Sequence, residues 1–140
     1  MVRERPYAEI RIGDTATFSK TISEHDIYAF AGITGDFNPV HVDAEAAKKG
    51  LFKERVAHGF LGASLISTVL GTDLPGANTI YLAQEVSFKA PVKIGDTLTV
   101  VCEVVEKKDD KKILKLKTTV HNQNGTVVVD GIATVMKYER

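Results

Sequence analysis

The sequence contains no tryptophan, a single cysteine and no excess of either charge. Eighteen Lys and Arg residues balance eighteen Asp and Glu residues, so the basic excess typical of nucleic-acid-binding proteins is missing. One cysteine excludes a disulfide within the chain, and the position of Cys102 in an alternating apolar run indicates a core residue rather than a nucleophile. The composition therefore excludes a disulfide scaffold, and we expect no nucleic-acid partner.

The sequence also lacks a recognisable signal peptide and a clear membrane span. Residues 1–6 are charged and include no apolar stretch. Residues 56–72 carry no charged side chain, but they include His58 and several Gly, Ser and Thr residues, which favours a buried core helix. We therefore expect no membrane association and a cytoplasmic location.

The first half of the chain has the pattern of one strand followed by helices. Hydrophobic residues make up 44% of a 140-residue chain, which predicts one domain with one core over residues 1–140. Residues 15–22 form a strand candidate, and a helix capped by Ser23 follows and ends at residues 32–35. Shorter and longer helices are expected at residues 44–49 and 59–72.

The second half has the alternation of strands. Apolar residues alternate with polar or small ones in four segments, at residues 80–88, 98–104, 114–120 and 126–136. The charged run 107–112 is typical of a solvated hairpin tip, and Asn124-Gly125 predicts a second hairpin. Gly131 marks a bulge or a close approach of another backbone. This order predicts an α+β fold in which a four-stranded antiparallel meander covers the apolar helix.

The segment from Asp36 to Ser67 contains the residues that point to chemistry. A carboxylate and an imidazole, Asp36 and His41, stand five residues apart across an Asn-Pro turn. The uncharged helix that follows would present free backbone N–H groups in its first turn, at Gly59. Such a set could move protons beside a developing oxyanion. The alternative is that Asp36 and Asn38 only form a turn by bonding their own backbone.

These segments resemble a known family. Residues 36–43 (DFNPVHVD) and 57–64 (AHGFLGAS) are similar to the hydratase-2 motif of MaoC-like proteins, in particular the single-domain (R)-specific enoyl-CoA hydratases. The resemblance extends over most of the chain, through Leu74-Pro75-Gly76, residues 80–82 and 86–92, and Gly95-Asp96. It implies a hot dog fold, in which an antiparallel sheet wraps a long central helix. It also implies reversible hydration of trans-2-enoyl-CoA to (R)-3-hydroxyacyl-CoA.

The resemblance assigns roles by position. It implies that Asp36 and His41 are catalytic, that the backbone N–H of Gly59 binds the oxyanion, and that Ser67 supports the site. It implies a homodimer, or a dimer of such dimers. Neither a metal nor a cofactor is expected, since coenzyme A arrives as part of the substrate.

The sequence leaves alternatives open for the acyl carrier and for the exact reaction. Because the chain has no net positive charge, a coenzyme A tail would depend on local cations, and three lie near the motifs in sequence: Lys89, Lys93 and Arg55. The same site could serve a 3-hydroxyacyl-acyl-carrier-protein dehydratase. A hot dog protein that binds or hydrolyses acyl thioesters is the alternative from another class.

Overall fold

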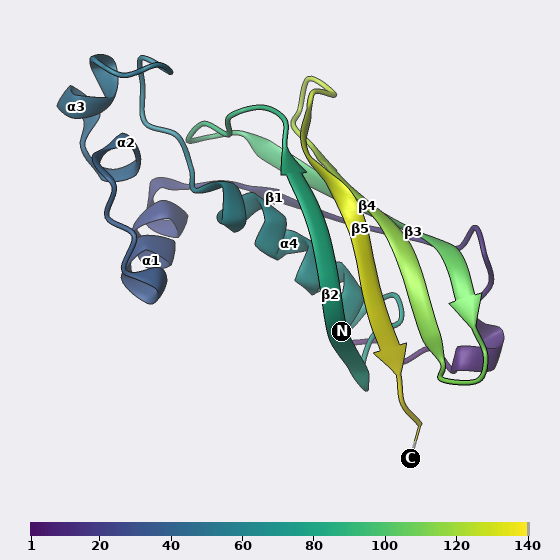
Figure 1. Cartoon of the computed structure of the whole chain (residues 1–140). Helices are drawn as coiled ribbons and strands as arrows, with labels where there is room; N and C mark the ends of the chain where they lie inside the picture. Colours follow the sequence, from purple (N-terminus) through teal and green to yellow (C-terminus); the bar gives the residue numbers. More distant parts are fainter. Residues whose placement is uncertain (140) are drawn as a thin grey trace.

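A curved five-stranded antiparallel sheet around one helix forms the centre of the protein (Figure 1). The computed structural model describes residues 1–139. The elements are η1 (Tyr7–Glu9), β1 (Thr15–Thr21), α1 (Glu24–Thr34), α2 (Pro39–Val42), α3 (Ala44–Lys48), α4 (Gly59–Thr72), β2 (Thr79–Phe88), β3 (Thr97–Lys108), β4 (Ile113–His121) and β5 (Val127–Lys137). The predicted α+β hot dog arrangement is confirmed.

Helix α4 is the element that the sheet covers. One side of it is buried, through Leu61, Gly62, Leu65, Ile66, Val69 and Leu70. The concave face of the sheet packs on this side with alternating apolar residues, among them Leu98, Val100, Leu116 and Val135. Cys102 is buried in β3, and burial raises the pKa of its thiol to about 12, so it is a neutral core residue as predicted.

No helix among residues 1–139 combines the length and the apolar character that crossing a bilayer would require.

The strand order is β1-β3-β4-β5-β2. The predicted meander is correct for β3, β4 and β5 but wrong for β2, which pairs with β5 at the far edge of the sheet. The chain between β2 and β3 does not turn back as a hairpin. Instead it pairs with the segment before α4, through the Val56–Lys93 bridge and a 2.7 Å hydrogen bond from Ala57 N–H to the Val92 carbonyl.

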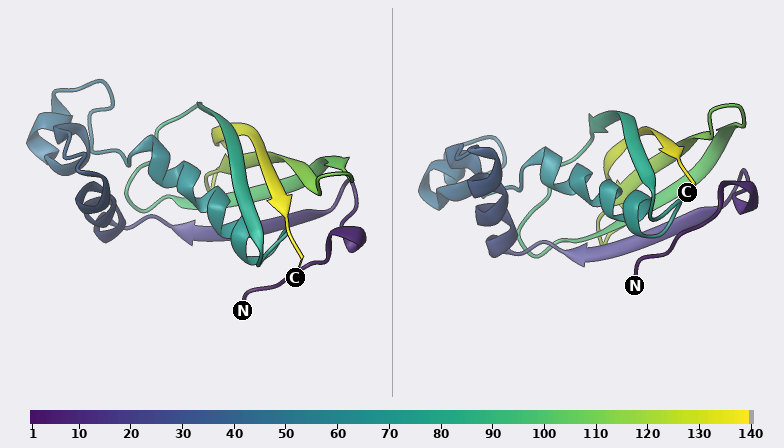
Figure 2. Two further views of the ribbon diagram at one scale, coloured as in Figure 1. Left: turned by 60° about the horizontal axis from the view of Figure 1, so that its bottom comes forward. Right: turned by 90° about the horizontal axis from the view of Figure 1, so that it is seen from below.

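Helices α1, α2 and α3 project beyond one end of the sheet (Figure 2). Ser23 and Asp26 form a reciprocal capping box at the start of α1, which ends at Gly35 in a left-handed conformation. Helix α2 was not predicted: Asn38 caps it by accepting from Val40 N–H, and Pro39 occupies its first turn. His41 therefore lies on a helical turn rather than on a loop.

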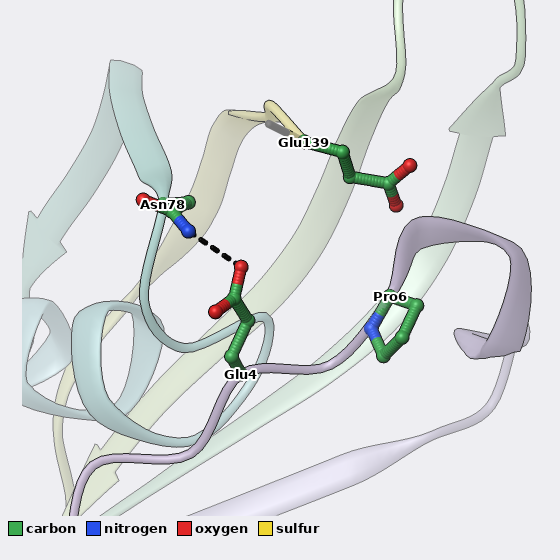
Figure 3. Close-up of a pocket in the computed structure, with 4 residues that line it drawn as sticks. All are labelled: Glu4, Pro6, Asn78 and Glu139. Atoms are coloured by element: carbon green, nitrogen blue, oxygen red, sulfur yellow. Dashed lines mark hydrogen bonds between the residues drawn. The ribbon is translucent and has the colours of Figure 1, made fainter.

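The two chain ends meet at the opposite end of the sheet, around a buried lysine. The Lys137 ammonium forms an ion pair with Glu4 at 3.1 Å and donates to the Ala77 carbonyl at 2.7 Å. Asn78 also donates to Glu4 (Figure 3). A pocket of about 470 Å³ lies here, lined by Glu4, Pro6, Asn78 and Glu139. Because its polar groups fasten the termini to β2 and β5, we interpret this pocket as structural.

Gly131 in β5 shows where the packing tolerates no side chain. A Cβ at this position would lie 1.7 Å from the Glu85 carbonyl oxygen of the neighbouring strand β2, so the close approach predicted from the sequence is present. We expect Gly131→Ala to lower the free energy of unfolding by about 3 kcal/mol, because the two backbones must move apart. Urea denaturation measures this loss.

Gly32→Ala in α1 is the matched control, since a Cβ there meets nothing within 4 Å. This substitution should leave stability unchanged or raise it by up to about 1 kcal/mol. Equal urea midpoints for the two variants would contradict the close contact between β5 and β2.

Candidate active site

Asp36 follows the end of α1 and uses its two carboxylate oxygens differently. Oδ1 accepts from the backbone N–H of Asn38 at 3.1 Å, which is a turn-forming contact. Oδ2 lies 4.0 Å from Nε2 of His41. The side chain is about half exposed, at 52%. Asp36 therefore forms the turn and also faces the imidazole, so the two interpretations of this residue are compatible.

His41 is held in one orientation by the backbone. Its Nδ1 lies 2.7 Å from the carbonyl oxygen of Val56. A carbonyl oxygen can only accept, so Nδ1 must carry the hydrogen. In the neutral ring, Nε2 is then an unprotonated acceptor on the side that faces Asp36.

His58 contacts both members of this pair. Its Nε2 is 2.9 Å from the Asp36 carbonyl oxygen, and its ring stacks on His41 with centroids 3.8 Å apart. Phe30 packs on it as well, at 4.9 Å. Only 3% of His58 is exposed.

Gly59 begins α4 and leaves its first turn accessible. His58, at the N-cap position, provides no side-chain cap, and Leu61 N–H donates to the His58 carbonyl at 3.0 Å. The N–H groups of Gly59 and Phe60, at the positive end of the helix, have no hydrogen-bond acceptor among the described residues 1–139. A Cβ on Gly59 would lie 2.8 Å from the ring of Phe88. The absence of a side chain therefore lets the Phe88 ring pack directly against the start of α4.

Two contiguous pockets meet at this point. The smaller, of about 260 Å³, is lined by Phe30, Thr34, Asp36, His41, His58, Gly59 and Phe60. The larger, of about 550 Å³, is mainly apolar and is lined by Asn38, Val40, His41, Phe52, Val56, Ala57, Gly59, Phe60, Phe88, Lys89, Ala90, Pro91, Val92, Val128 and Val129. Because both include His41, Gly59 and Phe60, an extended molecule could pass from the apolar pocket to the carboxylate.

The three cations that the sequence suggested differ in their surroundings. Lys89 is exposed and lines the larger pocket, and its ammonium makes no ion pair with any residue in the described range 1–139. Lys93 pairs with Glu54 at 3.5 Å. Arg55 binds Glu24 at 2.5 Å, and this hydrogen bond lowers the pKa of the Glu24 carboxyl. Lys89 is therefore the candidate whose charge is still available to a ligand.

Within one chain, Ser67 does not lie next to Asp36 and His41. It is exposed on α4, eight residues after Gly59 and thus about 12 Å along the axis. It lines neither of the two pockets. Its supporting role stays a prediction from the resemblance.

Asp36, His41 and His58 also form a group of potential metal ligands. Each offers one atom, and these atoms lie within 4.8 Å of one another. The carbonyl oxygens of Asp36 and Val56 each engage one nitrogen of an imidazole, so each ring has a single nitrogen left. The group is the only one of this kind among residues 1–139.

The spacing of Asp36 and His41 suits a single water molecule. A water oxygen about 2.8 Å from both Oδ2 and Nε2 would form nearly a right angle with them, close to the angle between the O–H bonds of water. Both groups are acceptors, so one water could donate one hydrogen to each. With the N–H groups of α4 alongside, the arrangement can deprotonate water next to a site for negative charge.

Sequence reasoning did not identify the two carbonyl groups that orient the histidines. Val56 lies 15 residues from His41, and His58 lies 22 residues from Asp36, so no local pattern links them. The contact between Phe60 and Phe88, which pack edge to face at 5.3 Å beside Gly59, was not predicted either, because the two residues belong to different elements.

The chain is similar over most of its length to proteins of one known family. Residues 8–126 match the family model of the MaoC like domain. The chain is 48% identical over 130 residues to an (R)-specific enoyl-CoA hydratase of Rhodospirillum rubrum, which covers 93% of this chain and 90% of that protein. It is 41% identical over 126 residues to an (R)-specific enoyl-CoA hydratase of Aeromonas caviae, covering 90% and 94%. The solved structure of R-hydratase PhaJ1 from Pseudomonas aeruginosa is similar with a TM-score of 0.94 and 47% identity, covering 99% and 89%.

Proposed function

The chain belongs to the MaoC-like domain family, and on this premise we propose that it catalyses the reversible (R)-specific hydration of trans-2-enoyl-CoA to (R)-3-hydroxyacyl-CoA. In enzyme class it is a hydro-lyase. The observation that carries the proposal is the 4.0 Å distance between Asp36 Oδ2 and His41 Nε2, next to the uncapped first turn of α4.

In the proposed mechanism, Asp36 and His41 act on one water molecule. Asp36 accepts a proton from the water while the water oxygen bonds to Cβ of the enoyl thioester. His41 Nε2 orients the same water and assists the proton transfer. The electron pair of the double bond moves toward the thioester carbonyl. The proton that Asp36 took from the water then passes to Cα, which completes the addition of one water molecule and returns Asp36 to its carboxylate form. General acid–base help of this kind contributes about 10²–10⁴-fold to the rate.

The negative charge on the thioester oxygen would be met by the backbone N–H of Gly59. This group lies at the positive end of a 14-residue helix. One such donor contributes roughly 10²–10³-fold. Gly59 lines both pockets, so a thioester bound there could reach this backbone group.

The larger pocket suits the arm of the thioester. Its lining is mainly apolar, with Phe52, Phe88 and Val128 among its residues, and Lys89 lies at its border. We propose that Lys89 contacts a phosphate of coenzyme A. Lys93 and Arg55 are weaker candidates, because Glu54 and Glu24 already balance their charges.

A 3-hydroxyacyl-acyl-carrier-protein dehydratase would use the same site in the reverse direction. A thioesterase would use it to hydrolyse the thioester bond, and a thioester-binding protein would use only the shape of the pocket. The test is an assay with crotonyl-CoA that follows the ultraviolet absorbance of the enoyl thioester. Loss of absorbance with (R)-3-hydroxybutyryl-CoA as product supports hydration. Release of free thiol would favour a thioesterase, and faster turnover of crotonyl-acyl-carrier protein would favour the dehydratase.

The same assay tests the expectation that no metal or separate cofactor takes part. Activity should survive EDTA, because Asp36 and His41 supply the proton transfer. A loss that Zn²⁺ restores would instead assign Asp36, His41 and His58 to a metal site.

We expect Asp36→Asn to lower kcat for crotonyl-CoA by several orders of magnitude, since an amide cannot accept a proton from water. His41→Ala should also be severe. The double variant should lose much less than the product of the two single losses, because both groups act on one water. Circular dichroism should show an unchanged fold. A folded Asp36→Asn protein with near-normal hydration would refute this mechanism.

Lys89→Glu should raise KM for crotonyl-CoA and leave kcat nearly unchanged, because the contact lies far from the reacting bond. Crotonyl-pantetheine, which lacks the nucleotide phosphates, should show no such increase. Lys93→Glu serves as the control, since its ammonium is already paired with Glu54. An equal KM increase with both thioesters would remove Lys89 from phosphate binding.

We further propose that two chains associate through the outer edge of β2. This strand pairs only with β5, so its other edge has no strand partner within the described residues 1–139. It exposes large apolar side chains, namely Ile80, Tyr81, Leu82 and Phe88. The opposite edge, β1, instead exposes Thr and Ser residues. An unpaired apolar edge favours pairing with a second chain.

We expect light scattering at micromolar concentration to give a dimer or a dimer of dimers. Leu82→Glu should shift the protein toward the monomer, because a buried unpaired carboxylate opposes association. Thr17→Glu on the edge strand β1 should leave the assembly intact. A wild-type monomer, or dissociation by Thr17→Glu alone, would contradict the proposed interface.

A further inference from the structure

His58 is a buried polar side chain that the proposed mechanism does not use. Among residues 1–139, the only other buried polar or charged residues are Thr118 and Lys137. His58 touches both members of the catalytic pair: its Nε2 lies 2.9 Å from the Asp36 carbonyl oxygen, and its ring stacks on His41. His58 is therefore a third side chain in the site, in contact with the two groups that act on water.

The hydrogen bonds determine where the hydrogen of His58 lies. The Asp36 carbonyl oxygen can only accept, so Nε2 must donate. In the neutral ring Nδ1 is then an unprotonated acceptor, and it is buried with no hydrogen-bond partner. An unpaired buried acceptor opposes folding. A phenylalanine would fill the same space without that penalty, which suggests that the donor at Nε2 has a use.

The segment from Val56 to His58 holds both catalytic groups from one side. The Val56 carbonyl fixes His41 through Nδ1, and the His58 side chain fixes the Asp36 backbone. Between them, Ala57 N–H is anchored to the Val92 carbonyl at 2.7 Å. These contacts together set the separation of Oδ2 and Nε2.

We infer, on the basis of the proposed function, that His58 is a positioning residue for the hydration reaction. It acts through two contacts. The hydrogen bond places the Asp36 main chain, and the stacked ring, at an interplanar angle of 27°, restricts rotation of His41. A water shared by two acceptors requires both to be placed to within fractions of an ångström.

Two variants separate the two contacts. His58→Gln can keep an N–H donor for the Asp36 carbonyl but removes the stacked ring. His58→Phe keeps a ring against His41 but removes the donor. Each should lower kcat for crotonyl-CoA by about 10–100-fold, as loss of a supporting partner commonly does, with KM little changed. His25→Gln is the matched control, since His25 is an exposed histidine of α1.

A readout on the resting protein makes the test independent of turnover. In ¹H–¹⁵N spectra, wild-type His41 should show a single tautomer with its hydrogen on Nδ1. The His58 variants should show exchange between tautomers or orientations, while His25→Gln should not. If the wild type hydrated no enoyl thioester, the proposed function would fail, but these spectra would still decide whether His58 orders His41.

Two outcomes would overturn the inference. Unchanged kcat and unchanged His41 signals in a folded variant would make His58 a purely structural residue. A loss of kcat as large as that of Asp36→Asn, with His41 signals unchanged, would mean that His58 acts on the substrate itself. Thermal unfolding identifies the variants that fold. If His58→Phe does not fold, His58→Gln alone is sufficient for the test.

Discussion

The burial of α4 by the curved sheet is the constraint on which the site depends. The helix has an apolar side that must be covered, and covering it fixes the place and direction of its N-terminus at Gly59. The residues just before it, Val56 to His58, are held by the connection between β2 and β3. Helix α2 is bound to this segment through Val56, whose N–H donates to the Val40 carbonyl and whose carbonyl accepts from His41. Helix α1 adds Ile27 to the core and packs Phe30 against His58, so the catalytic pair is positioned from the core outward.

Local sequence patterns predicted the elements better than their arrangement. The uncharged helix, the N-cap at Ser23 and the meander of β3, β4 and β5 all follow from periodicity and turn residues. The position of β2 does not, because alternation identifies a strand but carries no information about which neighbour it pairs with. Helix α2 is one turn long, too short for a periodic pattern, although Asn38 and Pro39 are good signals for its start.

For the site, the sequence predicted which residues matter more readily than how they are oriented. Asp36 could be read as a turn former or as a base, and its two oxygens have separate partners that allow both. Ser67 was assigned from the resemblance and the cations from their nearness to the motifs in sequence, and the fold brings only Lys89 of these residues to the lining of the larger pocket. The hydrogen positions on His41 and His58 depend on carbonyl groups of distant residues, so they are properties of the tertiary structure alone.

The two imidazoles show how backbone carbonyl groups can prepare a proton-transfer site. Each carbonyl accepts from one ring nitrogen and so directs the unprotonated nitrogen elsewhere. For His41 that nitrogen faces Asp36, where it can serve a water molecule; for His58 it is left buried without a partner. The protein thus retains an unsatisfied atom in its interior beside the reacting groups. A fold selected for stability alone would replace it, so the demand for accurate placement of Asp36 and His41 is the stronger explanation for its presence.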